Sequence, residues 1–165
     1  MDTHPHVGAV ARLKVNIEEK SFRSSNGGAI DVLRDLRFEV EQNEFACILG
    51  PSGCGKTTTL RILLGLEGDY RGSIRLPGLA EPRIGAVFQE PILLPWRSVE
   101  QNVRLALPKH LQDANLDTLF STLGLSKMRT FYPGELSLGL ARRAAIARAL
   151  AIEPDILLLD EPFVS

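Results

Sequence analysis

The sequence predicts a fold of the α/β class, on three observations. Residues 45–49 form a short apolar run without alternation, which is typical of a strand buried on both faces. A loop with three glycines and then an apolar helical pattern follow this run directly. A second apolar run, at residues 156–159, ends in two acids. The chain has 165 residues, which suffice for one α/β domain with its own core.

The N-terminal part is predicted to form antiparallel strands. Apolar and polar residues alternate over residues 13–17 and again over residues 36–40, as they do in strands with one face in water. Residues 23–29 are rich in Ser, Asn and Gly, and they predict a loop between the two strands. Residues 41–44 then form a polar turn that leads into the apolar run at 45–49.

The middle of the chain predicts two further strands. The helix after the glycine loop is expected to end at the glycines of residues 65–68. Residues 72–76 predict a short edge strand, and residues 84–88 predict a buried strand that ends at Gln89. The next segment, residues 90–97, contains two prolines and cannot form a regular helix.

Three helices are predicted before the last strand. Residues 98–101 fit a capping box, so a helix is expected to begin there and to stop before Pro108. Leucine and phenylalanine side chains share one helical face over residues 116–123, and Gly124 ends that helix. A long alanine-rich helix is expected over residues 140–151.

The glycine loop has the pattern G-x-x-x-x-G-K-T between a strand and a helix, which is the context of a phosphate-binding loop. Its glycines let the backbone approach a ligand, and the free amides at the helix start point at phosphates. Lys56 adds positive charge for the β- and γ-phosphates, and the Thr57 hydroxyl is placed to ligate Mg²⁺. The alternative is a chance glycine turn before a helix. The candidate phosphate-binding residues are Gly50, Pro51, Ser52, Gly53, Cys54, Gly55, Lys56, Thr57 and Thr58.

The two cysteines argue against a disulfide framework. Cys47 lies in the predicted buried strand and is expected to be an inert apolar residue. Cys54 lies within the glycine loop, near a helix N-terminus, where a thiol becomes reactive. The other interpretation of Cys54 is a small side chain that points away from the ligand.

The acids after residues 156–159 supply the partner of the glycine loop. Asp160 at the strand tip can hold Mg²⁺ directly or through water. Glu161 can orient and polarise an attacking water. Gln89 also follows a strand, so its amide can reach the metal or the water. The alternatives are an ordinary strand-to-turn boundary for the acids and a surface-loop residue for the glutamine.

Composition excludes several classes of function. The net charge is −1, so no nucleic-acid-binding surface is expected. The apolar stretches are far shorter than the roughly 20 residues that a bilayer requires. Residues 1–11 lack a basic start and a long apolar core, so no signal peptide is predicted. A cytosolic protein is the default expectation.

Together these motifs resemble the nucleotide-binding subunit of ABC transporters, across essentially the whole chain. The Walker A motif of that family resembles GPSGCGKTT, its Walker B motif resembles LLLDEP, and its Q-loop glutamine matches Gln89. The signature motif is matched in position by LSLGLARRAAIARAL. The run VFQEPILLPWRSVEQNV is similar to the subgroup that energises import of nitrate, sulfonates, taurine and related small anions.

The resemblance implies a P-loop NTPase domain over residues 1–165. It has a RecA-like core, an N-terminal antiparallel β subdomain and a helical signature subdomain at about residues 92–150. The resemblance also implies that Phe22 stacks on adenine and that Ser137 and Gly139 contact the γ-phosphate.

By the same resemblance, the protein is an ATPase that uses ATP and Mg²⁺ to drive import. It would form a head-to-tail homodimer on the cytoplasmic face of the membrane and bind permease subunits and, through them, a solute-binding protein. Residues 91–96 would receive the permease, with Trp96 either in that contact or in the core. The alternatives are a soluble ABC ATPase that acts on nucleic acid or ribosomes, and a non-hydrolysing nucleotide-binding fragment.

The chain departs from the family pattern in two places. Leu138 and Leu140 stand where the usual signature L-S-G-G-Q has Gly and Gln, so that half of the site is expected to be weaker or shifted. The chain also stops at Ser165, before the family's D-loop, a further strand and a histidine that contacts the γ-phosphate. We therefore expect a C-terminally incomplete domain that is marginally folded by itself.

Overall fold

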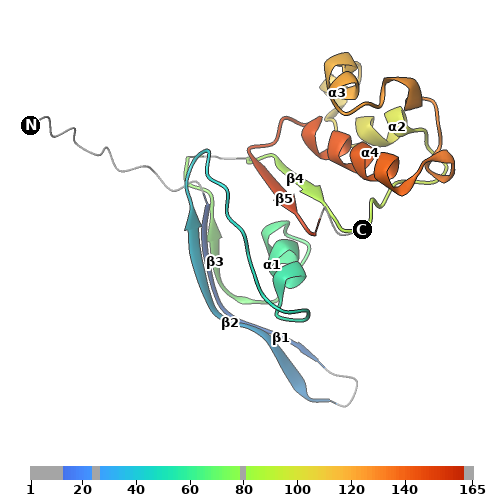
Figure 1. Cartoon of the computed structure of the whole chain (residues 1–165). Helices are drawn as coiled ribbons and strands as arrows, with labels where there is room; N and C mark the ends of the chain where they lie inside the picture. Colours follow the sequence, from blue (N-terminus) through green and yellow to red (C-terminus); the bar gives the residue numbers. More distant parts are fainter. Residues whose placement is uncertain (1–12, 24–26, 79–80, 162–165) are drawn as a thin grey trace, which may run out of the picture. The chain divides into compact units, whose positions relative to one another are not determined.

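The computed structural model describes residues 13–23, 27–78 and 81–161 (Figure 1). Residues 1–11, for which no signal peptide is predicted, lie outside these ranges. The chain divides between Glu81 and Pro82 into two compact units, each with its own internal contacts. No helix within the described ranges has both the length and the apolarity to cross a membrane.

The first unit is built on an antiparallel sheet of three strands in the order β2-β1-β3. The strands are β1 (Leu13–Arg23), β2 (Ala29–Val40) and β3 (Arg71–Arg75). The alternation predicted at the start of β1 is confirmed, since Leu13, Val15 and Ile17 are buried between exposed or half-buried neighbours. The predicted strand pair and the edge position of β3 are confirmed as well.

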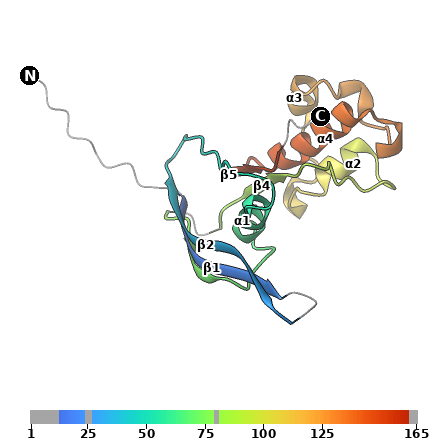
Figure 2. The same ribbon diagram turned by 60° about the horizontal axis from the view of Figure 1, so that its bottom comes forward.

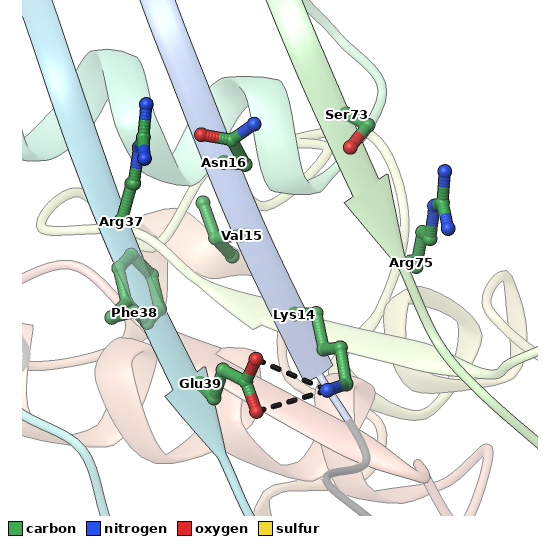
Figure 3. Close-up of a pocket in the computed structure, with 8 residues that line it drawn as sticks. All are labelled: Lys14, Val15, Asn16, Arg37, Phe38, Glu39, Ser73 and Arg75. Carbon is green, nitrogen blue, oxygen red and sulfur yellow. Dashed lines mark hydrogen bonds and ion pairs between the residues drawn. The ribbon is translucent and has the colours of Figure 1, made fainter.

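Lys14 and Asn16 alternate along β1 with the buried residues. On their face, the sheet carries a mainly cationic hollow of about 360 Å³ (Figure 3). Lys14 donates two hydrogen bonds of 3.1 Å to the carboxylate of Glu39 on the neighbouring strand. Arg37 and Arg75 extend from the strands on either side of Asn16. None of the residues predicted for the functional site lines this hollow.

The apolar run at residues 45–49 is not a strand, so that prediction is wrong for this structure. The Phe45 side chain is 99% exposed, the Leu49 side chain is 85% exposed, and Cys47 is exposed instead of buried. The physical reason is that a strand needs a neighbour to accept and donate its backbone hydrogen bonds. No described residue forms a backbone hydrogen bond with this run. The polar turn before it is present, with Glu44 N–H donating to the Glu41 carbonyl at 3.3 Å.

The helix that follows the glycine loop is α1 (Lys56–Leu63), which lies beside the sheet in both views (Figures 1 and 2). Its apolar face is buried at Ile62 and Leu63. Gly65 has a φ of 69°, a backbone conformation that favours glycine, and it ends the helix where the sequence predicted.

The second unit has a helical part with its own core. The α-helices are α2 (Val99–Arg104), α3 (Asp117–Thr122) and α4 (Leu138–Leu150), and the short 3₁₀ helices are η1 (Lys109–Leu111), η2 (Ser126–Met128) and η3 (Pro133–Glu135). The predicted capping box is present, because Ser98 Oγ accepts from Gln101 N–H and the Gln101 side chain accepts from Ser98 N–H. Helix α2 packs against α4 (Figure 1), and Val103, Phe120 and Ala144 are fully buried between the helices.

The second unit also holds a parallel pair of strands, β4 (Ile84–Val87) and β5 (Ile156–Leu159). Both strands lie where the sequence predicted them. They are less buried than predicted, since Leu157 and Leu159 are exposed on one side of β5. Gly85 lets α4 approach β4 closely, because a Cβ there would lie 2.7 Å from the Ala149 carbonyl oxygen.

Candidate functional site

The glycine loop has the backbone that its sequence requires. Gly53 has a φ of 81° and Gly55 a φ of 96°, values that side-chain-bearing residues rarely adopt. Gly55 is also buried, and a Cβ there would lie 2.5 Å from Leu33 Cδ2 and 3.0 Å from the Val32 carbonyl oxygen. The last glycine of the motif thus allows the loop to pack directly on β2, and it places the start of α1.

Lys56 is held over its own loop. Its Nζ donates to the carbonyl oxygens of Gly50, at 2.9 Å, and of Pro51, at 3.1 Å. These carbonyls belong to the first two residues of the motif, so the side chain of its seventh residue reaches back to the start of the loop. A positive charge next to exposed loop amides is the arrangement that binds a phosphate.

The other loop positions are mostly open to solvent. Gly50, Pro51, Ser52, Gly53, Cys54 and Thr57 are exposed, and Thr58 is half-buried. The Cys54 thiol lies across the loop from Gly50, and a Cβ at Gly50 would collide with its Sγ. Thr59, which the sequence did not single out, is buried, and its Oγ1 donates to the Gly55 carbonyl at 3.0 Å. This bond fixes the first turn of α1.

Phe22 lies one residue before the end of β1, and its side chain is exposed. The ammonium of the buried Lys20 lies 4.4 Å from its ring centroid, an arrangement that the negative face of an aromatic ring favours. Lys20 therefore occupies one face of the ring and holds its orientation.

Gln89 and the two acids lie at one end of the parallel strand pair. The last register pair of β4 and β5 joins Val87 to Leu159, so the residues that follow both strands come out at the same edge. Asp160 is buried there, and its N–H donates to the Val87 carbonyl at 2.8 Å. Glu161 and Gln89 are exposed, and Glu161 has a φ of 45°. The structure thus brings the predicted acids and amide to a common edge.

The signature segment begins at the N-terminus of α4. Ser137 is the N-cap residue, and its Oγ accepts from Leu140 N–H at 3.3 Å. Leu138 is 57% exposed, and a Cβ at Gly139 would meet no atom within 4 Å. Leu140 packs against the helical core, so the residue that replaces the usual glutamine has a structural role.

Phe22 and the glycine loop belong to the first unit, and Gln89, Ser137, Gly139, Asp160 and Glu161 belong to the second. Within the second unit, two further residues hold the segment that follows Gln89, and sequence reasoning missed both. They are Asn102 and Arg148, which hold the backbone of residues 90–97. Two features of the sequence could have identified them. Asn102 is a polar residue on the apolar side of α2, and Arg148 is a single arginine among the alanines near the end of α4.

Comparison with known proteins gives a consistent result. A family model described as ABC transporter matches residues 33–164. The aliphatic sulfonates import ATP-binding protein SsuB 2 of Burkholderia lata is 48% identical over 137 residues, which cover 80% of this chain and 50% of that protein. The aliphatic sulfonates import ATP-binding protein SsuB of Bacillus licheniformis is 45% identical over 157 residues, which cover 92% and 61%. The chain thus spans about half to three fifths of the length of these relatives.

Two solved structures share the fold. One is a dimeric post-hydrolysis state of the ATP-binding cassette MJ0796 bound to ADP and Pi, with a TM-score of 0.78 and 28% identity. The match covers 92% of this chain and 74% of that one. The other is a dimeric structure of MJ0796, described as a bacterial ABC transporter cassette, with a TM-score of 0.77, 28% identity and coverages of 91% and 74%.

Proposed function

Since the chain belongs to the ABC transporter family, with the fold of an ATP-binding cassette, we propose that it binds and hydrolyses ATP to energise an importer of aliphatic sulfonates. The observation that carries this proposal is the glycine loop. Its two left-handed glycines and the charge of Lys56 at the start of α1 support a role in binding phosphates. The solute class rests on the names of the most similar relatives.

In the proposed reaction, the amides of residues 50–58 and the ammonium of Lys56 bind the phosphates. Phe22 stacks on adenine with the ring face that Lys20 leaves open. Glu161 polarises the attacking water, and Gln89 at the same strand edge helps to orient it. Ser137 and Gly139 of a second copy bind the γ-phosphate, which the exposed N-terminus of α4 suits.

The oxygen side chains at these positions fit Mg²⁺, which prefers oxygen ligands and keeps several waters. Thr57, Gln89 and Asp160 would hold it, and Asp160 is already fixed in the strand register through its N–H. When bound, Mg²⁺ neutralises charge that develops on the phosphates.

The proposed partners are a second copy of this subunit and membrane permease subunits, through which a solute-binding protein is engaged. Dimers of the related cassette MJ0796 support the first of these. The exposed side chains of Ile92 and Trp96 support residues 91–96 as the permease-facing segment. Trp96 is 70% exposed, so the alternative of a core tryptophan is wrong. The subunit would then work at the cytoplasmic face of the membrane.

The test separates binding from hydrolysis in the assembled transporter. Glu161→Gln should keep the affinity for a fluorescent ATP analogue and lower ATP turnover by roughly 10²–10⁴-fold, because the water loses its base. Lys56→Ala should lose nucleotide binding itself. Cells without the gene should fail to grow on an aliphatic sulfonate as the only sulfur source and still grow on sulfate. Unchanged turnover in the Glu161 variant would exclude this residue from the mechanism. Normal growth of the cells without the gene on the sulfonate would exclude aliphatic sulfonates as the solute.

A further inference from the structure

The segment that follows Gln89, residues 90–97, has no regular secondary structure and yet has a defined path. Two prolines remove backbone donors, and Ile92 has a φ of 42°, which is strained for a β-branched residue. Such a path persists only where the surroundings impose it. Here two side chains from two different helices impose it.

Asn102 of α2 holds the distal half of the segment. It is fully buried, and its Oδ1 accepts from Leu94 N–H at 2.8 Å. Its Nδ2 donates to the carbonyl oxygens of Leu94, at 3.1 Å, and Arg97, at 3.0 Å. This amide gives partners to the Leu94 N–H and to the Arg97 carbonyl, and it adds a second donor to the Leu94 carbonyl, which already accepts from Arg97 N–H at 3.1 Å.

Arg148 of α4 holds the proximal half, next to Gln89. Its guanidinium donates to the Ile92 carbonyl at 2.7 Å and to the Pro91 carbonyl at 3.2 Å. A planar guanidinium can bond two neighbouring carbonyls at once, whereas an ammonium is a point donor. Burial disfavours the charged form and lowers the pKa of Arg148, so the contacts to the two carbonyls are made by a partly desolvated guanidinium.

We propose that Arg148 is a positioning residue that ties the backbone after Gln89 to helix α4. The N-terminal end of the same helix carries Ser137 and Gly139, and Arg148 lies in its last turn. A helix transmits displacement along its axis because its hydrogen bonds are continuous. The Pro91–Ile92 backbone therefore follows α4, and so does the attachment of Gln89. This inference rests on the proposed function for the roles of Gln89 and Ser137, while the anchor itself does not depend on that function.

The anchor can be tested on the nucleotide-free 165-residue chain. A nitroxide label on Ile92→Cys, in a Cys47→Ser and Cys54→Ser background, reports motion at an exposed position next to the bonded carbonyls. Arg148→Met keeps an apolar stem and removes the donors, so the mobile fraction of the spectrum should rise by about twofold or more. Arg148→Lys keeps the positive charge but loses the planar guanidinium, so it should give a smaller rise in the mobile fraction. This variant replaces Arg148→Met in the test if the Met variant fails to fold.

Arg143→Met is the matched control. Arg143 lies on the same helix and also donates to a backbone carbonyl, that of Leu123 at 3.2 Å, in a different loop. This variant should leave the label at position 92 unchanged. Equal mobility in the parent and in both Arg148 variants would overturn the anchor, and so would an equal rise in the Arg143 variant.

The role in the reaction is tested separately in the assembled transporter. Arg148→Lys should keep the affinity for a fluorescent ATP analogue and lower kcat by about ten- to a hundredfold, because Gln89 loses its fixed position. A kcat that stays at the parent value while the label becomes mobile would overturn the positioning role. Failure of the parent protein to bind nucleotide would instead overturn the proposed function, and the result with the label would stand.

Discussion

At the scale of single residues, Lys20 shows how one buried charge organises its neighbourhood. Its ammonium donates to the Glu67 carboxylate at 2.8 Å and to the Asp69 carbonyl at 2.7 Å, and it also lies over the Phe22 ring. These contacts join the end of β1 to the connection between α1 and β3. The proposed adenine-stacking ring is therefore oriented by a residue that the sequence analysis did not single out.

The Lys20–Glu67 contact predicts a loss of stability in acid. The hydrogen bond from Lys20 holds the pKa of Glu67 below its ordinary value of 4.5. A carboxylate whose pKa is lowered by folding stabilises the folded state above the pKa of the unfolded chain, and the stabilisation is lost as the pH falls through the folded-state pKa. Thermal unfolding should therefore show a Tm that decreases below about pH 4.5, and Glu67→Gln should flatten this dependence.

Glu39→Gln is the control for this effect, because Glu39 pairs with Lys14 on the exposed face of the same sheet. Exposed pairs contribute little, so this variant should keep the acid dependence of the parent. If Tm decreases with pH equally in the parent and in the Glu67 variant, another group causes the loss of stability in acid.

The exposed thiol of Cys54 predicts chemical inactivation. Alkylation with N-ethylmaleimide should block binding of an ATP analogue, because the added group occupies the loop in which the phosphates are proposed to lie. Mg-ATP should protect the thiol. Cys47 is exposed too, so the experiment requires a Cys47→Ser background. In that background, additional Cys54→Ser should confer resistance, and inactivation of this double variant would exclude Cys54.

At the scale of elements, the apolar run at residues 45–49, the glycine loop and helix α1 depend on different interactions. Helix α1 begins at Lys56 because Gly55 takes a left-handed conformation as its N-cap residue and because Thr59 bonds back to the Gly55 carbonyl. The loop and the helix are thus defined by local geometry. The apolar run before them depends on neighbouring strands, and it has none among the described residues.

Two glycine substitutions separate conformational strain from packing. Gly53→Ala should cost about 1–2 kcal/mol in free energy of unfolding, since its φ is 81° and a Cβ there meets no atom within 4 Å. Gly55→Ala should cost about 2–4 kcal/mol, because it adds a collision with Leu33 and the Val32 carbonyl to a similar backbone strain. Urea denaturation measures both values, and equal costs would contradict the close packing of Gly55 on β2.

At the scale of the whole molecule, two small units carry exposed apolar surface. Phe45 and Leu49 are exposed in the first unit, and Leu157 and Leu159 are exposed on β5 in the second. Exposed apolar side chains promote association. That the chain is marginally folded by itself remains a prediction. These exposed apolar side chains support it, because they are not buried in either unit.

Polar substitutions in the apolar run test this description directly. Phe45→Ser with Leu49→Ser should lower the binding of a hydrophobic dye and reduce aggregation, and it should change the free energy of unfolding by less than about 1 kcal/mol. The control is Ile17→Ser, which places a hydroxyl at a fully buried position and should cost about 3 kcal/mol or more. A comparable cost for the double variant would mean that residues 45–49 are buried in solution, as the sequence predicted.

The sequence by itself determined the features that depend on neighbours a few residues away. Alternation identified β1 and β2, the box at Ser98 and Gln101 identified the start of α2, and the glycines and Lys56 identified the loop that begins α1. The family and the cassette fold followed from these motifs and are confirmed by the comparisons. Capping, alternation and left-handed glycines are local properties, so short stretches of residues encode them.

Only the tertiary structure decided which groups meet across long separations. It showed that residues 45–49 form no backbone hydrogen bond with any described residue, that Trp96 is exposed, and that Arg148 bonds to carbonyls more than fifty residues away. It also showed that Lys20 donates to Glu67, which lies 47 residues further along the chain. The physical reason is that a hydrogen bond needs a donor and an acceptor within about 3 Å of each other, and residue types alone do not say which distant segment supplies the second atom.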